Sequence, residues 1–230
     1  MPYFQPNELT VYKSPFNKVR MGKDGDGGYI ISDVPGINYS ILLSGGIAGD
    51  ISFEEDLIKK YPNMKCYGFD GSIDKLPKEN SSITFVKKYI GYHNDDEFSN
   101  LHEYINNYDN IFVKMDIEGS EFRWFKSLTI EHLNKFSQIV MEIHFPFTQN
   151  DFFKNLNKNH VLIHLHVNNS CKLKMYKGVL IPKVFEVTYL HKKYFVSKPE
   201  LNKMPLPSNL DMKCVPSRPD YEINHPPFVN

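Results

Sequence analysis

The feature that most constrains this chain is an alternation of short apolar runs with helical segments. Seven runs suited to β-strands lie at residues 39–43, 65–69, 83–86, 111–121, 138–145, 161–169 and 184–190. Predicted helices lie at residues 51–61, 101–108, 124–136 and 152–159. This alternation predicts an α/β fold, in which right-handed crossovers leave helices on both faces of one sheet.

The last two runs differ from the others in their connection. Residues 170–183 are too few for a helical crossover, so the seventh strand is predicted to run antiparallel to the sixth. Five parallel strands and a terminal hairpin distinguish a class I methyltransferase sheet from a plain dinucleotide-binding fold. We predict one domain at residues 1–197, which begins with a lead segment. Seven prolines mark residues 198–230 as an extended or loosely packed tail.

The composition excludes few functions, but it limits the classes of partner that we expect the protein to bind. Lysine and arginine together number 27, as do aspartate and glutamate, so nothing points to a nucleic acid. The three cysteines are widely spaced and form no CxxC pair, which favours the reduced cytoplasm. The first residues show no signal-peptide core, and no run of eighteen apolar residues occurs. We therefore predict a soluble cytoplasmic protein without a membrane partner.

Residues 111–121, IFVKMDIEGSE, are predicted to carry acidic groups at the end of a buried strand. Ligands of open α/β sheets bind at the carboxyl ends of the strands. Asp116 still lies on this strand, so we interpret it as a functional residue. For Glu118 and Glu121 two interpretations stay open, because carboxylates are also favoured in the first turn of the following helix.

A strand, a glycine-rich loop and a helix follow one another at residues 39–61. The loop, SGGIAGD at 44–50, lets the backbone approach a ligand, and the helix start offers free N–H groups. Alone it is a weak signal, because it lacks the GxGxxG pattern. Asp70 strengthens it, since an acid at the end of the second strand is placed to bind two ribose hydroxyls. The alternative is that Asp70 and Gly71 form only a turn.

Several phrases resemble the FkbM-like group of S-adenosylmethionine-dependent methyltransferases, namely SGGIAGDISFE, KMDIEGSE, IVMEIHF, IHLHVNN and FEVTYLHK, within roughly residues 20–195. The resemblance implies a class I, Rossmann-like, seven-stranded sheet and S-adenosyl-L-methionine as cofactor. Its motifs assign cofactor binding to Ser44, Gly45, Gly46, Asp50, Glu54, Asp70 and Asp116. The chain departs from the group at Ala48, where glycine is usual, and this departure puts the cofactor affinity in doubt.

The strand order implied by the resemblance gathers polar side chains at one edge of the sheet. The last strand lies between the fifth and sixth, so Glu186 is expected near His144 and His166, with Asp116 one strand further over. We predict that His144 is the general base for a hydroxyl acceptor, with His166 and Glu186 as orienting or substrate-binding partners. A divalent metal held by Asp116, His144 and His166 is an open alternative, as is a purely structural role for any strand histidine.

The leading hypothesis is an O-methyltransferase that acts on a hydroxyl of a sugar or similar polyhydroxylated small molecule, with surface-glycan synthesis as one setting. An NAD(P)-dependent Rossmann-type oxidoreductase also has a glycine loop followed by an acid, but the missing GxGxxG and the predicted hairpin count against it. A non-catalytic cofactor-binding module of the same fold is the third hypothesis. For the tail, covering the site and covering a neighbouring subunit both stay open, and the second would make a homo-oligomer.

Overall fold

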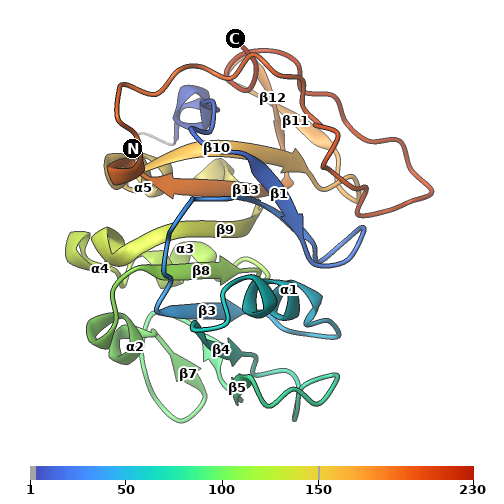
Figure 1. The fold of residues 1–230 in the computed structure, drawn as a ribbon. Helices are drawn as coiled ribbons and strands as arrows, with labels where there is room; N and C mark the ends of the chain where they lie inside the picture. The colour runs from blue at the N-terminus through green and yellow to red at the C-terminus, as the bar shows by residue number, and fades with distance from the viewer. Residues whose placement is uncertain (1–3, 150) are drawn as a thin grey trace.

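A seven-stranded mixed sheet forms the centre of the computed structural model, which describes residues 4–149 and 151–230 (Figure 1). The strand order is β10-β13-β9-β8-β3-β4-β5. The bounds are β3 Ile41–Gly45, β4 Lys65–Phe69, β5 Ile83–Val86, β8 Ile111–Met115, β9 Phe136–His144, β10 His160–Val167 and β13 Val184–His191. Each run predicted as a strand therefore contributes a strand to this sheet, and the α/β prediction is confirmed.

Strand β13 runs against both of its neighbours in the sheet. β3, β4, β5, β8 and β9 pair in parallel, whereas β13 pairs antiparallel with β9 and with β10. The antiparallel direction predicted from the short connection is confirmed, and this mixed arrangement is compatible with a Rossmann-like fold. The carboxyl ends of β3, β4, β8, β9 and β10 consequently lie at one edge, together with the start of β13.

Smaller elements surround the sheet. The helices are α1 Ser52–Lys60, α2 His102–Asn107, α3 Glu121–Phe125, α4 Ile130–Lys135 and α5 Phe152–Asn159. Three short strand pairs are β1 Lys18–Met21 with β2 Tyr29–Ser32, β6 Tyr89–Ile90 with β7 Phe98–Ser99, and β11 Leu173–Tyr176 with β12 Val179–Pro182. Single turns of 3-10 helix are η1 Pro6–Leu9, η2 Pro146–Thr148 and η3 Lys192–Tyr194.

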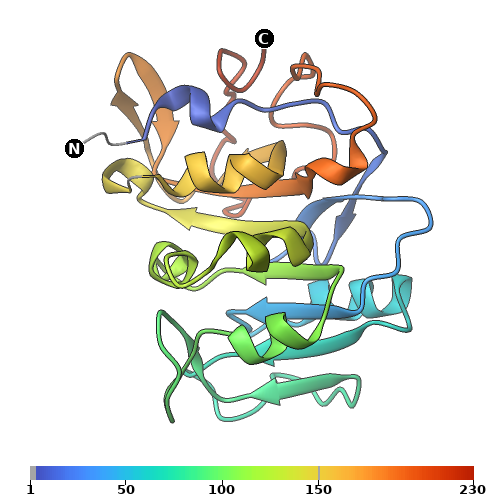
Figure 2. The same cartoon turned by 90° about the vertical axis from the view of Figure 1, so that its left-hand side faces the viewer.

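The two faces of the sheet pack into different apolar cores, because successive side chains of a strand point to opposite faces. Leu43 and Val113 belong to the core that includes α2, α3, α4 and α5. Leu42 and Phe112 belong to the core that includes α1 and the β1–β2 hairpin. Helices therefore cover both faces, as predicted, but they are distributed unequally (Figure 2).

Residues 124–136, predicted as one helix, form parts of two short helices, so this prediction was wrong. α3 ends at Phe125 and α4 begins at Ile130. Thr129 caps α4, because its Oγ1 accepts the His132 N–H at 3.2 Å and the His132 ring accepts the Thr129 N–H at 3.4 Å. This reciprocal capping box starts a new helix and interrupts the pattern.

The tail, residues 198–230, is irregular but well packed. Leu206, Ile223 and Phe228 are at most 2% exposed and belong to the core on the side of α2 to α5. The Asn202 N–H donates to the Val11 carbonyl at 3.0 Å. The proline-rich segment therefore carries apolar anchors that pack against the rest of the domain. The tail lies on the β10 side of the sheet (Figure 1).

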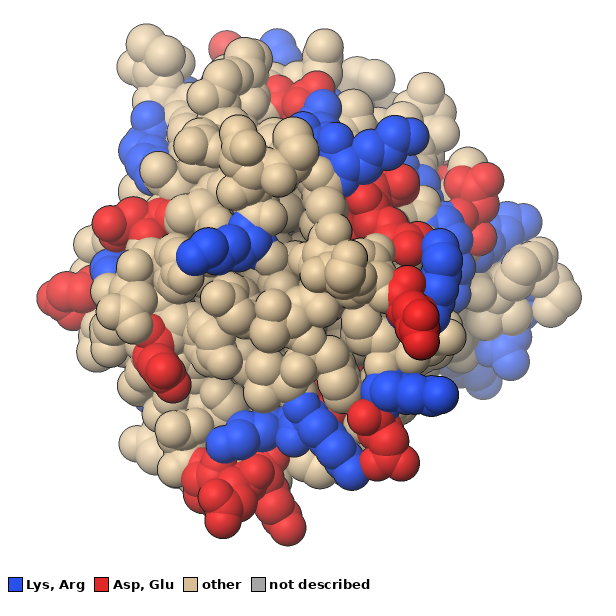
Figure 3. Space-filling model, turned by 60° about the horizontal axis from the view of Figure 1, so that its bottom comes forward, with Lys and Arg blue, Asp and Glu red and all other residues tan. Residues whose placement is uncertain are grey.

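The surface carries charges of both signs. On the face that Figure 3 shows, basic and acidic side chains are interspersed and form no broad area of one sign, and ion pairs such as Lys78–Glu55, at 3.0 Å, join neighbouring segments. No helix among residues 4–149 and 151–230 is both long and apolar enough to cross a bilayer. Cys66, Cys171 and Cys214 are all free thiols.

Candidate functional site

A cavity of about 550 Å³ opens at the carboxyl ends of β3, β4 and β8. We call it the strand-end cavity. Its lining consists of Gly46, Ala48, Phe69, Asp70, Gly71, Ser72, Lys88, Tyr89, Ile90, Phe98, Asp116, Ile117, Glu118 and Ser120. Gly46, Asp70 and Asp116, which were predicted from three separate strand ends, therefore meet around one cavity of a size that suits a nucleotide-like ligand.

Gly46 holds the ends of three strands together. Its N–H donates to the Phe69 carbonyl at 3.0 Å, and its φ of 78° lies in the left-handed region. A Cβ at this position would lie 1.7 Å from the carbonyl oxygen of Asp116. The loop thus approaches β8 more closely than any side chain allows, which explains why the chain needs glycine here.

Asp70 organises the same loop from β4. Its Oδ2 accepts the N–H groups of Ile47 and Ala48 at 3.1 and 2.8 Å, and its Oδ1 accepts the N–H and hydroxyl of Ser72 at 2.7 and 2.6 Å. Burial raises the pKa of Asp70, but the hydrogen bonds from Ser72, Ala48 and Ile47 outweigh burial and keep that pKa below its usual value. Four donors occupy the carboxylate, so a ribose hydroxyl must displace one of them, and the rotatable Ser72 hydroxyl is the simplest to displace.

Four of the predicted cofactor-binding residues do not line the strand-end cavity; they are Ser44, Gly45, Asp50 and Glu54. The Ser44 hydroxyl donates to the buried Glu54 carboxylate, and Lys114 Nζ lies 3.5 Å from Glu54. Lys114 also donates to the Gly46 carbonyl at 2.8 Å. Through these contacts Ser44, Glu54 and Lys114 support the loop at Gly46 without lining the cavity. Asp50 also lies outside the cavity lining, and it accepts the Ser52 hydroxyl at 2.9 Å.

Asp116, Glu142 and His144 form a compact group at the ends of β8 and β9, which we call the Asp116 cluster. One ligand atom from each lies within 4.8 Å of the other two. The Tyr29 hydroxyl donates to Asp116 Oδ2 at 3.0 Å, and the Asn168 amide donates to Glu142 Oε1 at 2.6 Å. His144 Nε2 lies 3.2 Å from Glu142 Oε2. Every member is therefore oriented by a neighbour.

The pKa values of His144 and Asp116 are both shifted upward in this cluster. Burial lowers the pKa of His144, but hydrogen bonds to Glu121 and Glu142 outweigh burial and raise that pKa to about 10. The imidazolium form of His144 has no free lone pair with which to accept a proton. Burial and the charge of Glu142 raise the pKa of Asp116 to about 7, which suits proton acceptance near neutral pH.

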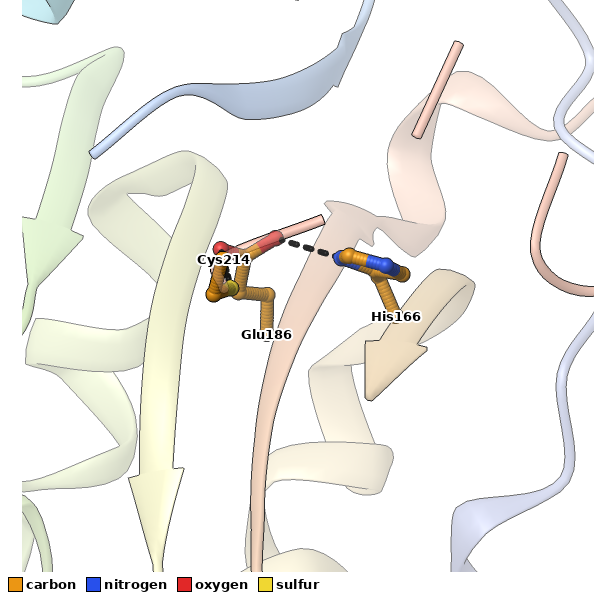
Figure 4. Close-up of side chains that lie close together, drawn as sticks. All are labelled: His166, Glu186 and Cys214. Carbon is orange, nitrogen blue, oxygen red and sulfur yellow. Dashed lines mark hydrogen bonds and ion pairs between the residues drawn. The ribbon is translucent and has the colours of Figure 1, made fainter. Parts of the chain in front are cut away.

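His166 and Glu186 belong to a different group, formed with Cys214 of the tail (Figure 4). We call it the His166 cluster. Because Glu186 pairs across the sheet with both Glu142 and His166, the two clusters are neighbours but do not merge. The expected group of Asp116, His144 and His166 is therefore corrected. Glu142, and not His166, lies together with Asp116 and His144.

Four further residues contribute ionisable groups at the carboxyl ends of β9 and β10: Glu121, for which the sequence left two interpretations open, and Asp211, Cys214 and Asp220, which the sequence analysis did not single out as site residues. Glu121 is fully buried, and its Oε1 lies 3.1 Å from His144 Nδ1, although helix capping was an equal alternative. Asp220 Oδ2 lies 3.1 Å from His166 Nε2. Asp211 and Cys214 also come from the tail. The acidic position of Glu121 after a strand was a usable signal, whereas no periodic pattern brings the tail residues to the sheet.

The chain was compared with protein-family models, curated proteins and solved structures. No family model, curated protein or solved structure matches it.

Proposed function

We propose that this protein is an S-adenosylmethionine-dependent O-methyltransferase of the FkbM-like type, acting on a hydroxyl of a sugar or similar polyhydroxylated small molecule. One observation carries the proposal: Gly46, Asp70 and Asp116 surround one cavity at the carboxyl ends of adjacent strands. The antiparallel β13 between β9 and β10 supports it, since this order is the one that the resemblance to class I methyltransferases implies.

The lining of the strand-end cavity fits the parts of an adenosyl ligand. Asp70 offers a carboxylate to the ribose, and Tyr89, Ile90 and Phe98 supply apolar surface for an aromatic base. Gly46 lines the same cavity, and its backbone would lie against the amino-acid part of the ligand. Asp116 lines the same cavity next to Gly46, and the acceptor hydroxyl is expected to approach its carboxylate.

Asp116 is the proposed general base. S-adenosylmethionine supplies a methyl group that is already activated by its sulfonium, so the protein chiefly has to align the acceptor and receive its proton. The Tyr29 hydroxyl orients the Asp116 carboxylate, and a pKa of about 7 lets that carboxylate accept a proton at neutral pH. The imidazolium of His144 and the carboxylate of Glu142 position groups around it rather than receive the proton.

The Asp116 cluster also has a donor set that fits a divalent cation. Two carboxylates and one imidazole are hard and intermediate ligands, and their ligand atoms lie within 4.8 Å of one another. A cation held there would lower the pKa of an acceptor hydroxyl. This second mode of activation keeps the same reaction and the same residues, with Asp116 as a ligand instead of a base.

Calorimetric titration with S-adenosylhomocysteine tests the proposal. We expect saturable binding to the folded protein and a loss of affinity of at least about 10-fold in Asp70→Asn, because hydrogen bonds to a charged group are replaced by neutral ones. Asp74→Asn is the matched control, since the side chain of Asp74 is 89% exposed and lies outside the cavity lining. Absence of binding by a well-folded sample would contradict the proposal.

Two further titrations separate the alternatives. If the protein is a nicotinamide-dependent oxidoreductase, NAD(P)H fluorescence will change on binding while S-adenosylhomocysteine fails to bind. If it is a non-catalytic module, S-adenosylhomocysteine will bind but no acceptor in a panel of monosaccharides and other polyols will be methylated. The proposed enzyme binds S-adenosylhomocysteine and methylates at least one class of hydroxyl acceptor.

A further inference from the structure

In the His166 cluster, a side chain of the tail contacts the sheet where β10 ends and β13 begins. His166 is on β10 and Glu186 is on β13, whereas Cys214 belongs to the tail (Figure 4). His166 and Glu186 are at most 7% exposed. Neither the strand-end cavity nor the proposed methyl transfer uses these three side chains.

The spacing of the three side chains matches a small tetrahedral site. His166 Nδ1 lies 3.3 Å from Glu186 Oε2, and Cys214 Sγ lies 3.8 Å from Glu186 Oε1. One ligand atom from each residue lies within 4.8 Å of the other two. Zinc bonds of about 2.0 to 2.3 Å in a tetrahedron place neighbouring ligands roughly 3.3 to 3.8 Å apart. The two distances involve different oxygens of Glu186, so the carboxylate would have to turn, and the His166 and Cys214 ligand atoms, which lie within 4.8 Å of each other, would have to close around one ion.

The histidine is oriented as a metal ligand usually is. Its Nε2 lies 3.1 Å from Asp220 Oδ2, which leaves Nδ1 directed at Glu186. A ligating histidine commonly donates its other ring N–H to a carboxylate, and this contact fixes the ring. Asp220 thus has the position of the supporting carboxylate rather than that of a ligand.

The charge balance of the buried cluster also favours a cation. Carboxylate oxygens of Glu186, Asp211 and Asp220 all lie within 3.9 Å of the ring of His166. Asp211 has a second partner in His164, at 2.8 Å, and His164 in turn lies 3.1 Å from Lys18 Nζ. Glu186 has no basic partner besides His166 among the described residues. Burying several carboxylates against so few cations costs free energy, which a bound divalent ion would offset.

We propose that His166 Nδ1, a Glu186 carboxylate oxygen and Cys214 Sγ bind a divalent metal ion of the zinc class, with a fourth position for water. Nitrogen, oxygen and sulfur together select such an ion over magnesium or calcium. On binding, the Cys214 thiol releases its proton and coordinates as a thiolate. Burial lowers the pKa of His166, but the neighbouring carboxylates outweigh burial and raise that pKa to about 10, so the imidazolium of His166 also releases its Nδ1 proton and this nitrogen can coordinate. Both protons go to solvent. The ion ties the proline-rich tail to β10 and β13, beside the Asp116 cluster. This inference does not depend on the proposed methyl transfer.

Cobalt(II) is the probe, because its complexes with thiolates absorb by charge transfer from sulfur. We expect Co²⁺ titration of the full chain to produce this band with one equivalent, and Zn²⁺ to remove it by competition. Cys214→Ser should abolish the band, whereas Cys171→Ser, which removes the other partly buried thiol, should leave it unchanged. No thiolate band in the wild type, or an equal band in Cys214→Ser, would overturn the proposal.

A second variant guards against a folding defect in Cys214→Ser. Glu186→Gln keeps the shape of the side chain, so we expect it to fold and to bind Co²⁺ at least about 10-fold more weakly, in line with the effect of removing a ligand or its support. Hydrogen exchange of residues 205–220 should slow when Zn²⁺ is added to the wild type, and it should not slow in Glu186→Gln. Equal metal affinity in the two proteins would contradict the site, and S-adenosylhomocysteine titration of both samples reports separately on the proposed function.

Discussion

The two ends of the sheet edge at which β3, β4, β8, β9 and β10 end differ in the kind of groups that form them. Over β3 and β4 the strand ends leave an open cavity, and the contacts there are made mainly by backbone N–H groups around Gly46 and Asp70. Over β9, β10 and β13 the same edge is filled by buried ionisable side chains, such as His144 and His166. The first region should therefore be sensitive to added atoms and the second to altered charge.

The largest expected effect is that of Gly46→Ala in the open region. Its Cβ would lie 1.7 Å from the Asp116 carbonyl oxygen at a left-handed φ of 78°. Strain and overpacking together should lower the free energy of unfolding by about 2–5 kcal/mol and weaken S-adenosylhomocysteine binding. Urea unfolding measures the first effect, and calorimetry the second.

Gly49→Ala is the matched control for that variant. An added Cβ at Gly49 meets no atom within 4 Å, so this variant should unfold at nearly the same urea concentration as the wild type. If both variants behaved alike, the close approach of the loop to β8 would not be what stabilises the cavity.

The second largest expected effect is the loss of the charge of Asp116, which belongs both to the strand-end cavity and to the Asp116 cluster. Asp116→Asn should lower kcat by about 100-fold or more, since general-base catalysis contributes about that much. Methyl transfer by the wild type should rise as the pH increases through about 7, where the Asp116 carboxyl loses its proton. Release of S-adenosylhomocysteine with an active sugar acceptor measures both. Undiminished turnover in Asp116→Asn would rule out this residue as the base.

Where buried ionisable side chains fill the sheet edge, Glu121→Gln should lower the pKa of His144 by at least about one unit, because the carboxylate beside the imidazolium is replaced by a neutral amide. The Gln oxygen can still accept the N–H groups of Ile117 and Gly119, which Glu121 Oε1 now accepts at 3.2 and 3.1 Å. NMR titration of the imidazole signals measures the pKa. Glu118→Gln is the control, because the side chain of Glu118 is 85% exposed and should matter less.

The same histidine links stability to pH. Its pKa in the folded protein, about 10, lies above the ordinary histidine value of 6.5. The stability contributed by protonated His144 is therefore fully present below about pH 6.5 and is lost as the pH rises through about 10. Urea midpoints of wild type and Glu121→Gln should converge over that range. A constant difference would show that the ion pair has no such effect.

The smallest expected effect returns to the open region. Ala48 lies at a φ of 46°, in the left-handed region, and its N–H donates to Asp70. Ala48→Gly should raise the free energy of unfolding by about 0.5–1 kcal/mol, because relief of left-handed strain exceeds the entropic cost of glycine. A lower urea midpoint would contradict this, and calorimetry would show whether glycine also tightens cofactor binding.

Local patterns in the sequence predicted most of the fold. The strands at 65–69 and 83–86 and the helix at 152–159 have the predicted bounds, because turn residues or a change of period mark both of their ends. The direction of β13 followed from the length of the preceding connection. The helix at 124–136 was predicted wrongly, because the capping interaction of Thr129 with His132 overrides the continuous pattern.

The positions of candidate site residues could be predicted where each residue follows a strand. Properties that depend on contacts between residues from different elements could not be predicted. Gly46, Asp70 and Asp116 were found because each follows an apolar run. The protonation of His144 was not, since two carboxylates from different elements, Glu121 and Glu142, determine it. The contribution of Cys214 was also missed, because the path of the tail depends on long-range packing of single apolar residues.

Hydrogen exchange in the presence of S-adenosylhomocysteine tests the central claim most directly. The account predicts slower exchange at residues 44–50 and 68–72, which surround Gly46 and Asp70, while exchange in the β11–β12 hairpin stays unchanged. No protection of those two segments at a saturating concentration of ligand, or protection confined to the hairpin, would show that the strand-end cavity does not hold an adenosyl cofactor.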